Sequence, residues 1–160
     1  MRFFGIAALA LLAASCGDKA PAPAPSETAD ATPENAPGIA LSGARVQLPV
    51  VSGRPGAAYF TLSLANGAPR KLVSVSVAMA GRAEMHETAG GTMKPVKDVP
   101  LEPGKAIAFK PGGYHVMLFD LDPKLRFEKE VDLTVTLDDG EKATVKAPVT
   151  TVAEAMEHMH

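Results

Sequence analysis

Short runs that alternate between apolar and polar residues, each ended by Gly, Pro, Asn or Asp, fill the chain from Ile39 onward. In the clearest run, Val131, Leu133, Val135 and Leu137 occupy every second position. A period of two is typical of a β-strand that buries one face, and no stretch here keeps the 3.6-residue period of a long helix. The pattern predicts an all-β fold, an antiparallel β-sandwich or barrel.

Other runs extend this interpretation. Tyr59–Leu64 is strand-like and leads into Asn66-Gly67, a dipeptide that favours tight hairpin turns. Val73, Val75 and Val77 are predicted to share the buried face of a further strand. The length of 160 residues suits one such domain with appendages.

The N-terminus has the features of a secretory signal. Arg2 precedes the apolar run Phe3–Ala14, which is too short for the roughly 20 residues that span a bilayer. Leu12-Ala13-Ala14-Ser15-Cys16 resembles a bacterial lipobox, in which the Cys is acylated and becomes the mature N-terminus. The resemblance implies a lipidated Cys16 and a periplasmic protein anchored to a membrane.

The next segment is rich in Ala, Pro, Ser, Thr and Glu, and it has no aliphatic side chain larger than Ala. Such a segment buries too little surface to offset its ordering entropy, so we predict a disordered, semi-extended linker. The expected organisation is a lipoprotein-type signal peptide at 1–15, this linker at 16–37, a β-sandwich domain at 38–150 and a tail at 151–160.

Charge and cysteine content exclude several functional classes. Lys and Arg number 16 and Asp and Glu number 18, a net charge of −2 that argues against a nucleic-acid partner. Cys16 is the single cysteine, which excludes an internal disulfide framework, a multi-thiolate zinc site and a blue-copper site. No nucleophile motif such as G-x-S-x-G is present, so we expect a protein that is not an enzyme.

Methionine and histidine occur together in this chain, because each of the four His residues has a Met within two positions. Thioether sulfur favours copper in its reduced state, and imidazole also binds that ion. His115 and Met117 are two apart in a strand-like run, so both side chains point to one face, and a preceding turn places them near a rim.

A second segment completes the candidate set. His86 lies near the end of a probable strand, just before Ala89-Gly90-Gly91, and Met93 follows that turn. We expect His86, Met93, His115 and Met117 to converge at one end of the sandwich as a Cu(I) site. Met79 and Met85 are expected in the core. We expect Glu84 and Glu87 to be solvated side chains. Of the two, Glu87 is the candidate to form a hydrogen bond that supports a metal ligand.

The segment from Ala83 to Leu121 resembles the periplasmic copper chaperone family PCuAC. That family's pattern is a His or Met, a Met some ten residues later, then twenty-one residues and His-x-Met. Here twenty-one residues separate Met93 from His115, and His115-Val116-Met117 completes the motif. Six residues separate His86 from Met93, which indicates a shortened hairpin. The resemblance covers roughly residues 39–149.

The resemblance implies a cupredoxin-like, Greek-key β-sandwich that binds one Cu(I). It implies delivery of copper to the CuA domain of cytochrome c oxidase subunit II, with a thioredoxin-like copper chaperone of oxidase assembly as a second partner. Two alternatives stay open. One is a copper-sequestering buffer or resistance lipoprotein, and the other is a metal-free lipoprotein interaction module.

The tail departs from strand patterning and is rich in copper ligands. Met156, His158, Met159 and His160 put four potential ligands into five residues. The stretch from Ala153 to Glu157 could start a short helix, but one too short to persist alone. Imidazole is the better ligand for oxidised copper. We hypothesise that the tail captures Cu(II) or recruits Cu(I) toward the body site.

Overall fold

A computed structural model describes residues 38–152 and residue 154. They form ten strands and a short 3-10 helix, η1 (Pro123–Phe127). The strands are β1 (Ile39–Gln47), β2 (Gly56–Leu64), β3 (Arg70–Val77), β4 (Ala80–Ala89), β5 (Thr92–Pro95), β6 (Val99–Leu101), β7 (Ala106–Phe109), β8 (Tyr114–Leu121), β9 (Glu130–Leu137) and β10 (Lys142–Thr150). Within the described residues, no helix has the length and hydrophobicity needed to cross a membrane.

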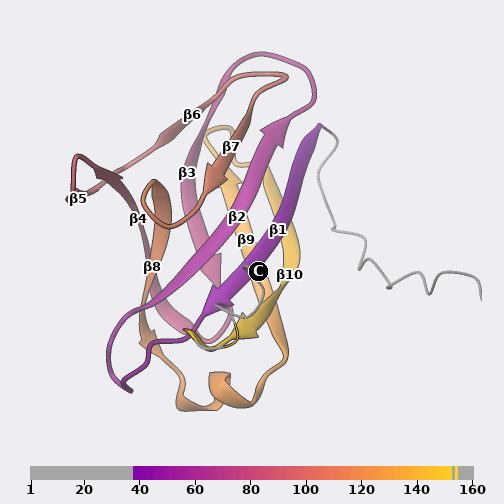
Figure 1. The fold of residues 1–160 in the computed structure, drawn as a ribbon. Helices are drawn as coiled ribbons and strands as arrows, with labels where there is room; N and C mark the ends of the chain where they lie inside the picture. The colour runs from indigo at the N-terminus through magenta and orange to yellow at the C-terminus, as the bar shows by residue number, and fades with distance from the viewer. Residues whose placement is uncertain (1–37, 153, 155–160) are drawn as a thin grey trace, which may run out of the picture. The chain divides into compact units, whose positions relative to one another are not determined.

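The strands form two packed layers, as the ribbon in Figure 1 shows. Their hydrogen-bonded order is β5-β4-β8-β7-β2-β1-β10-β9-β3-β6, and β8 also pairs with β2. The layers join where β1 pairs with β10 in parallel, with Val46 opposite Val149. The predicted all-β sandwich is therefore confirmed.

The core lies between these layers and follows the alternation of the sequence. Val131, Leu133, Val135 and Leu137 are buried, as the pattern predicted. The rings of Phe60 and Phe109 stack with centroids 4.3 Å apart. Burying a side chain of this size contributes about 1.5–3 kcal/mol, so the core fixes which face of each strand points inward.

The prediction for one residue of β3 is wrong. Val73 is 39% exposed, whereas its neighbour Leu72 is fully buried. The pairing of β3 with β9 shifts register between Leu72 and Ser74, which is a β-bulge. A bulge adds one residue to a strand and changes which positions face the core. Leu72 therefore takes the place predicted for Val73, while Val75 and Val77 are buried as predicted.

A two-residue turn connects β4 to β5. Gly90 and Gly91 have φ values of 58° and 78°, and two successive positive φ angles are the requirement of the type I′ turn that favours tight hairpins. Ala89 then pairs with Thr92 and Thr88 with Met93. This hairpin is as short as the six-residue spacing between His86 and Met93 indicated.

Candidate metal centre

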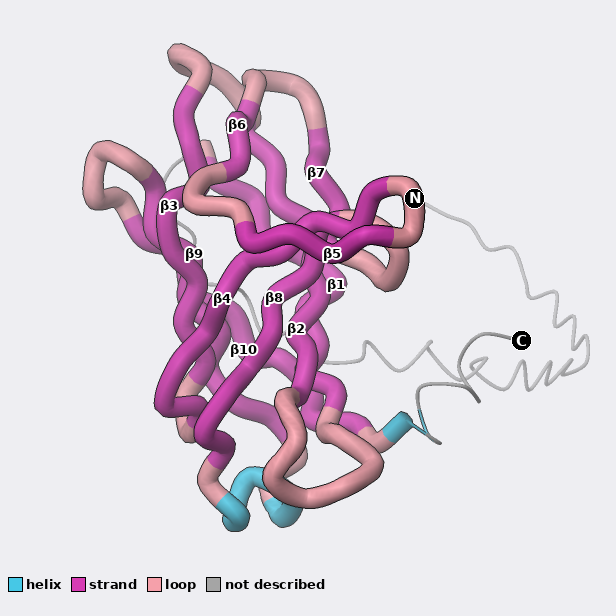
Figure 2. Tube along the Cα trace, turned by 90° about the vertical axis from the view of Figure 1, so that its left-hand side faces the viewer, coloured by secondary structure: helices cyan, strands magenta, loops and turns pink. Residues whose placement is uncertain are grey.

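Strands β4 and β8 lie side by side and antiparallel, and Figure 2 shows them together with β5 across their upper end. The register places His86 opposite His115 and Glu84 opposite Met117. Directly opposed residues of an antiparallel pair have their side chains on the same face. The two imidazole rings are accordingly close, with centroids 5.9 Å apart.

This face points away from the core. Met85 lies opposite Val116 in the same register, and both are buried in the core cluster. Because side chains alternate along a strand, their neighbours His86, His115 and Met117 belong to the outer face. Met85 is thus a core residue, as predicted, and Met79 packs partly buried against the same core.

Strand β5 brings the fourth candidate to the same face. Met93 lies opposite Thr88 of β4, while His86 lies opposite Pro95 of β5. Met93 is therefore the diagonal cross-strand neighbour of His86, within reach of a long side chain. Met93 is 51% exposed on an edge strand, whereas Met117 is half-buried between β4 and β2.

His115 presents one defined ring nitrogen. The side chain is 8% exposed, and its Nδ1 lies 3.0 Å from the carbonyl oxygen of Gly113. A carbonyl oxygen only accepts hydrogen bonds, so Nδ1 carries the proton and donates. Nε2 then holds the free lone pair, which is the arrangement that fixes and orients a metal-ligating histidine.

His86 presents the other ring nitrogen. Its Nε2 lies 3.4 Å from a carboxylate oxygen of Glu84, which accepts the proton of Nε2. The remaining nitrogen, Nδ1, is buried and has no hydrogen-bond partner among the described residues. Leaving a buried polar atom unpaired costs about 1–3 kcal/mol, and a bound metal ion would satisfy it.

The carboxylate that contacts His86 is that of Glu84, whereas Glu87 was the expected partner. Glu84 also forms an ion pair with Arg82, at 3.1 Å between Nη1 and Oε1. Glu87 instead lies opposite Tyr114 in the pairing of β4 with β8. Burial raises the pKa of the Tyr114 hydroxyl, and the charge of Glu87 raises it further. The two-residue spacing from His86 was the signal that favoured Glu84.

The structure thus brings His86, Met93, His115 and Met117 onto one face of three neighbouring strands. Within residues 38–152 and 154, no group of three or more His, Cys, Asp or Glu side chains is placed to hold a metal ion. Cys16 and the tail candidates Met156, His158, Met159 and His160 lie outside the described residues.

The donor set fits a soft ion. An imidazole nitrogen binds a metal ion at about 2 Å, so rings with centroids 5.9 Å apart can share one ion. Two thioethers beside two neutral imidazoles favour copper in its reduced state over harder divalent ions.

The family model of LpqE-like lipoproteins matches residues 39–149 of the chain. Among curated proteins, the uncharacterized protein RP573 of Rickettsia prowazekii is 34% identical over 98 residues. That match covers 58% of this chain and 54% of RP573, so the chain spans about half the length of this relative.

Solved structures of PCuAC domains share the fold. The copper-bound PCuAC domain from PmoF2 is 18% identical with a TM-score of 0.63, over 74% of this chain and 97% of that domain. The solution structure of CuI-DR1885 from Deinococcus radiodurans is 28% identical with a TM-score of 0.57, over 73% of this chain and 80% of that one. These similarities confirm the resemblance to PCuAC proteins and the cupredoxin-like fold.

We predict that His86 and His115 are opposite tautomers in the metal-free protein. Long-range ¹H–¹⁵N correlation spectra, recorded where both imidazoles are neutral, should show the proton on Nδ1 of His115 and on Nε2 of His86. Glu84→Ala should remove the preference at His86 and leave His115 unchanged, whereas the control Glu87→Ala should alter neither. Finding the same tautomer in both rings would contradict the assigned hydrogen bonds.

Proposed function

The chain belongs to the LpqE-like lipoprotein family, and on that premise we propose that it is a periplasmic copper chaperone that carries Cu(I) and is not a catalyst. The observation that carries the proposal is the set of two imidazoles and two thioethers on one face of β5, β4 and β8. Two solved relatives support copper as the cargo. The PCuAC domain from PmoF2 was determined with copper bound, and DR1885 was determined with CuI.

The roles of the four ligands follow from their surroundings. His86 binds through its buried Nδ1 and His115 through Nε2, because their other nitrogens face Glu84 and Gly113. Met93 and Met117 add the soft sulfur atoms that stabilise Cu(I) against oxidation. All four ligands are neutral, so the bound ion keeps its charge of +1 and is held less tightly than by thiolates.

Release starts from the exposed side of the site. Met93 is on the edge strand β5 and is half exposed, whereas His115 is almost fully buried. An acceptor that approaches this edge replaces the Met93 thioether first with a ligand of its own and then the remaining three. The copper stays Cu(I) throughout, so the exchange needs neither an oxidant nor a reductant.

The proposed acceptor is the CuA domain of cytochrome c oxidase subunit II, with a thioredoxin-like copper chaperone working beside this protein. The resemblance of residues 83–121 to PCuAC proteins supports this choice. A lipid on Cys16 would hold the domain at the periplasmic surface of a membrane, near a membrane-bound oxidase.

Replacing the ligands one at a time should weaken Cu(I) binding. Met93→Leu, His115→Ala and Met117→Leu should each lower the affinity by more than the 10–100-fold that is typical of losing an outer hydrogen-bond partner. The measurement is an anaerobic titration against a competing Cu(I) chelator. Met85→Leu, at a thioether in the core, should leave the affinity unchanged. Wild-type Cu(I) affinity in all three ligand variants would contradict the proposed site.

Transfer to an acceptor separates a chaperone from a buffer. Mixing the Cu(I)-loaded protein with an apo CuA domain should move copper to that domain. The transfer is measured, after oxidation, by the absorption of the mixed-valence CuA centre. Tight retention of copper would favour the sequestering lipoprotein instead. A protein that binds no Cu(I) at all would favour the metal-free interaction module.

The tail is proposed as a second copper site. Thr151 and Glu154 bond each other reciprocally, with Glu154 Oε2 accepting from the Thr151 N–H at 2.7 Å and Thr151 Oγ1 accepting from the Glu154 N–H at 3.3 Å. This reciprocal pair is a capping box, the pattern that caps helix N-termini, and the described residues Val152 and Glu154 have helical backbone. The predicted helix at 153–157 lies largely outside the described residues.

Deleting residues 151–160 should lower the copper stoichiometry or the Cu(II) affinity and leave the Cu(I) affinity of the body site unchanged. The full-length double variant His158→Ala and His160→Ala should reproduce the loss of Cu(II) affinity, which separates ligand loss from truncation. Identical copper titrations for all three proteins would contradict the proposed tail site.

A further inference from the structure

Exposed apolar side chains gather at the end of the sandwich away from the candidate metal centre. Val50 and Val51, in the loop between β1 and β2, are 81% and 61% exposed, and Phe127, at the end of η1, is 79% exposed. Figure 2 shows this loop and η1 next to each other at the lower end, with β5 well above them. Apolar side chains that cluster in the open in this way mark an interaction surface.

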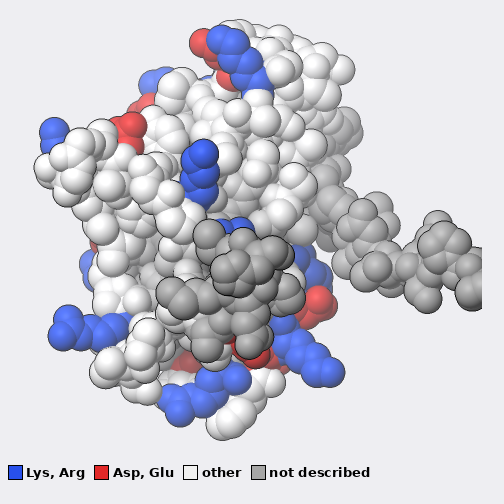
Figure 3. Space-filling view, viewed as in Figure 1, with Lys and Arg blue, Asp and Glu red and all other residues white. Residues whose placement is uncertain are grey.

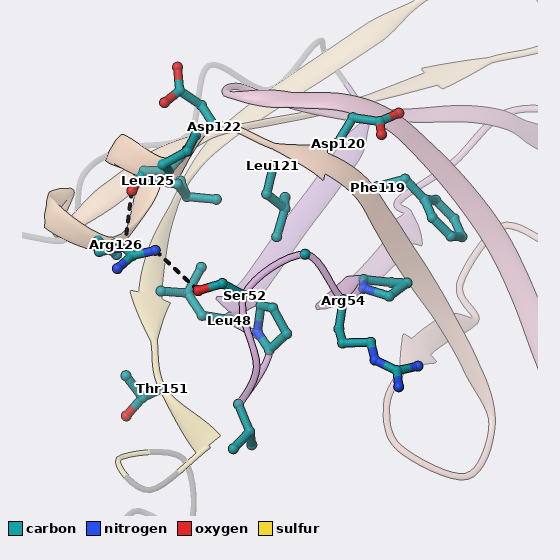
Figure 4. Close-up of a pocket in the computed structure, with 15 residues that line it drawn as sticks. Leu48, Ser52, Arg54, Phe119, Asp120, Leu121, Asp122, Leu125, Arg126 and Thr151 are labelled. Carbon is teal, nitrogen blue, oxygen red and sulfur yellow. Dashed lines mark hydrogen bonds between the residues drawn. The ribbon is translucent and has the colours of Figure 1, made fainter.

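Hydrogen bonds hold the two segments in place. Arg126 Nη2 donates to Ser52 Oγ at 3.2 Å, which ties η1 to the loop. Asp122 Oδ1 accepts from the N–H of Lys124 at 2.8 Å and caps η1. Figure 4 shows the hollow of about 450 Å³ between them, lined by Leu48, Leu121 and Leu125 among others. Val51 and Phe127 do not line the hollow, and both side chains are exposed.

The same two segments are basic, although the chain as a whole is acidic. Residues 48–55 and 122–129 contain four cationic side chains and two carboxylates, which gives 4 − 2 = +2, against −2 for the chain. The cationic residues are Arg54, Lys124, Arg126 and Lys129. In Figure 3, several Lys and Arg side chains lie at the lower end of the molecule, where Figure 1 draws η1, with fewer Asp and Glu side chains among them.

We infer that the basic end, defined as residues 48–55 and 122–129, docks on the surface of a bilayer that contains anionic phospholipids. Val50, Val51 and Phe127 would enter the interface between headgroups and acyl chains, while the Lys and Arg side chains contact the phosphates. Each Lys or Arg near such a surface contributes about 1 kcal/mol, which suits a reversible contact that supplements a lipid anchor.

Membership of a lipoprotein family supports a bilayer as the docking partner, because a lipid-anchored chain stays at a membrane. The linker is long enough for the contact. At 3.1 Å per residue for an extended Pro-rich chain, the 21 residues from 17 to 37 could reach at most about 65 Å from a lipidated Cys16. Strand β1, which runs from the end of the linker to the basic end, spans about 30 Å.

Docking in this orientation would hold the metal centre away from the lipid. His115 is near the start of β8 and Leu121, which lines the hollow, ends it. The six residue-to-residue steps from His115 to Leu121 correspond to about 20 Å of strand. The Met93 edge would then face the aqueous phase, where a partner's copper-binding domain can reach it.

A single tryptophan tests this inference, because the chain has none of its own. The full lipidated chain carrying Phe127→Trp is reconstituted on vesicles of phosphatidylglycerol and phosphatidylethanolamine with brominated acyl chains. The matched control is Val73→Trp, an exposed position on β3. We expect a blue-shifted emission from Phe127→Trp, and bromine quenching several-fold stronger than for the control.

The response should depend on charge. Phosphatidylcholine vesicles, or the added substitutions Lys124→Gln and Lys129→Gln, should reduce the quenching of Phe127→Trp toward the level of the control. Equal quenching of both reporters in anionic vesicles would overturn the inference. A blue shift without bromine quenching would also overturn it, because a protein segment would then cover Phe127. Copper is absent from this experiment, so its result is independent of the proposed chaperone function.

Discussion

The antiparallel pairing of β4 with β8 is the interaction on which the proposed metal centre depends. It sets His86 opposite His115 and keeps Met117 on the same face. A slip of one residue would turn these side chains toward the core and bring Met85 or Val116 out. Both of those residues are buried among apolar neighbours, so the hydrophobic core holds the register and, through it, the positions of the ligands.

Hydrogen bonds to the two imidazoles then determine which ring nitrogen of each histidine is left to bind a metal ion. The Gly113 carbonyl occupies Nδ1 of His115, and the Glu84 carboxylate occupies Nε2 of His86. The buried Nδ1 of His86 is left without a partner among the described residues, an unfavourable state that ion binding relieves. The proposed ligands are therefore oriented in the metal-free protein, which would reduce the reorganisation needed for copper to bind and to leave.

Local patterns in the sequence predicted most of the fold and the proposed ligands. Alternation found the buried faces of β8 and β9, and the His-x-Met spacing placed His115 and Met117 on one face. The Gly90-Gly91 pair accounted for the short hairpin that brings Met93 beside β4. These features depend on neighbours a few residues apart, which a single sequence displays.

Contacts between distant segments were not predictable in the same way. The bulge that exchanges Leu72 for Val73 arises from the pairing of β3 with β9, about sixty residues later in the chain. The basic end combines two segments, 48–55 and 122–129, that only the folded sandwich brings together.

Two separate parts of one β-sandwich are thus proposed to have different tasks, metal transport at the β5 edge and membrane contact at η1. The account is tested most directly by X-ray absorption spectroscopy of the protein, with its tail ligands removed, loaded with one equivalent of Cu(I). It predicts both nitrogen and sulfur neighbours around copper, with one sulfur fewer in Met93→Leu. A spectrum without sulfur neighbours, or one identical in Met93→Leu and Met117→Leu to that of the unsubstituted protein, would contradict it.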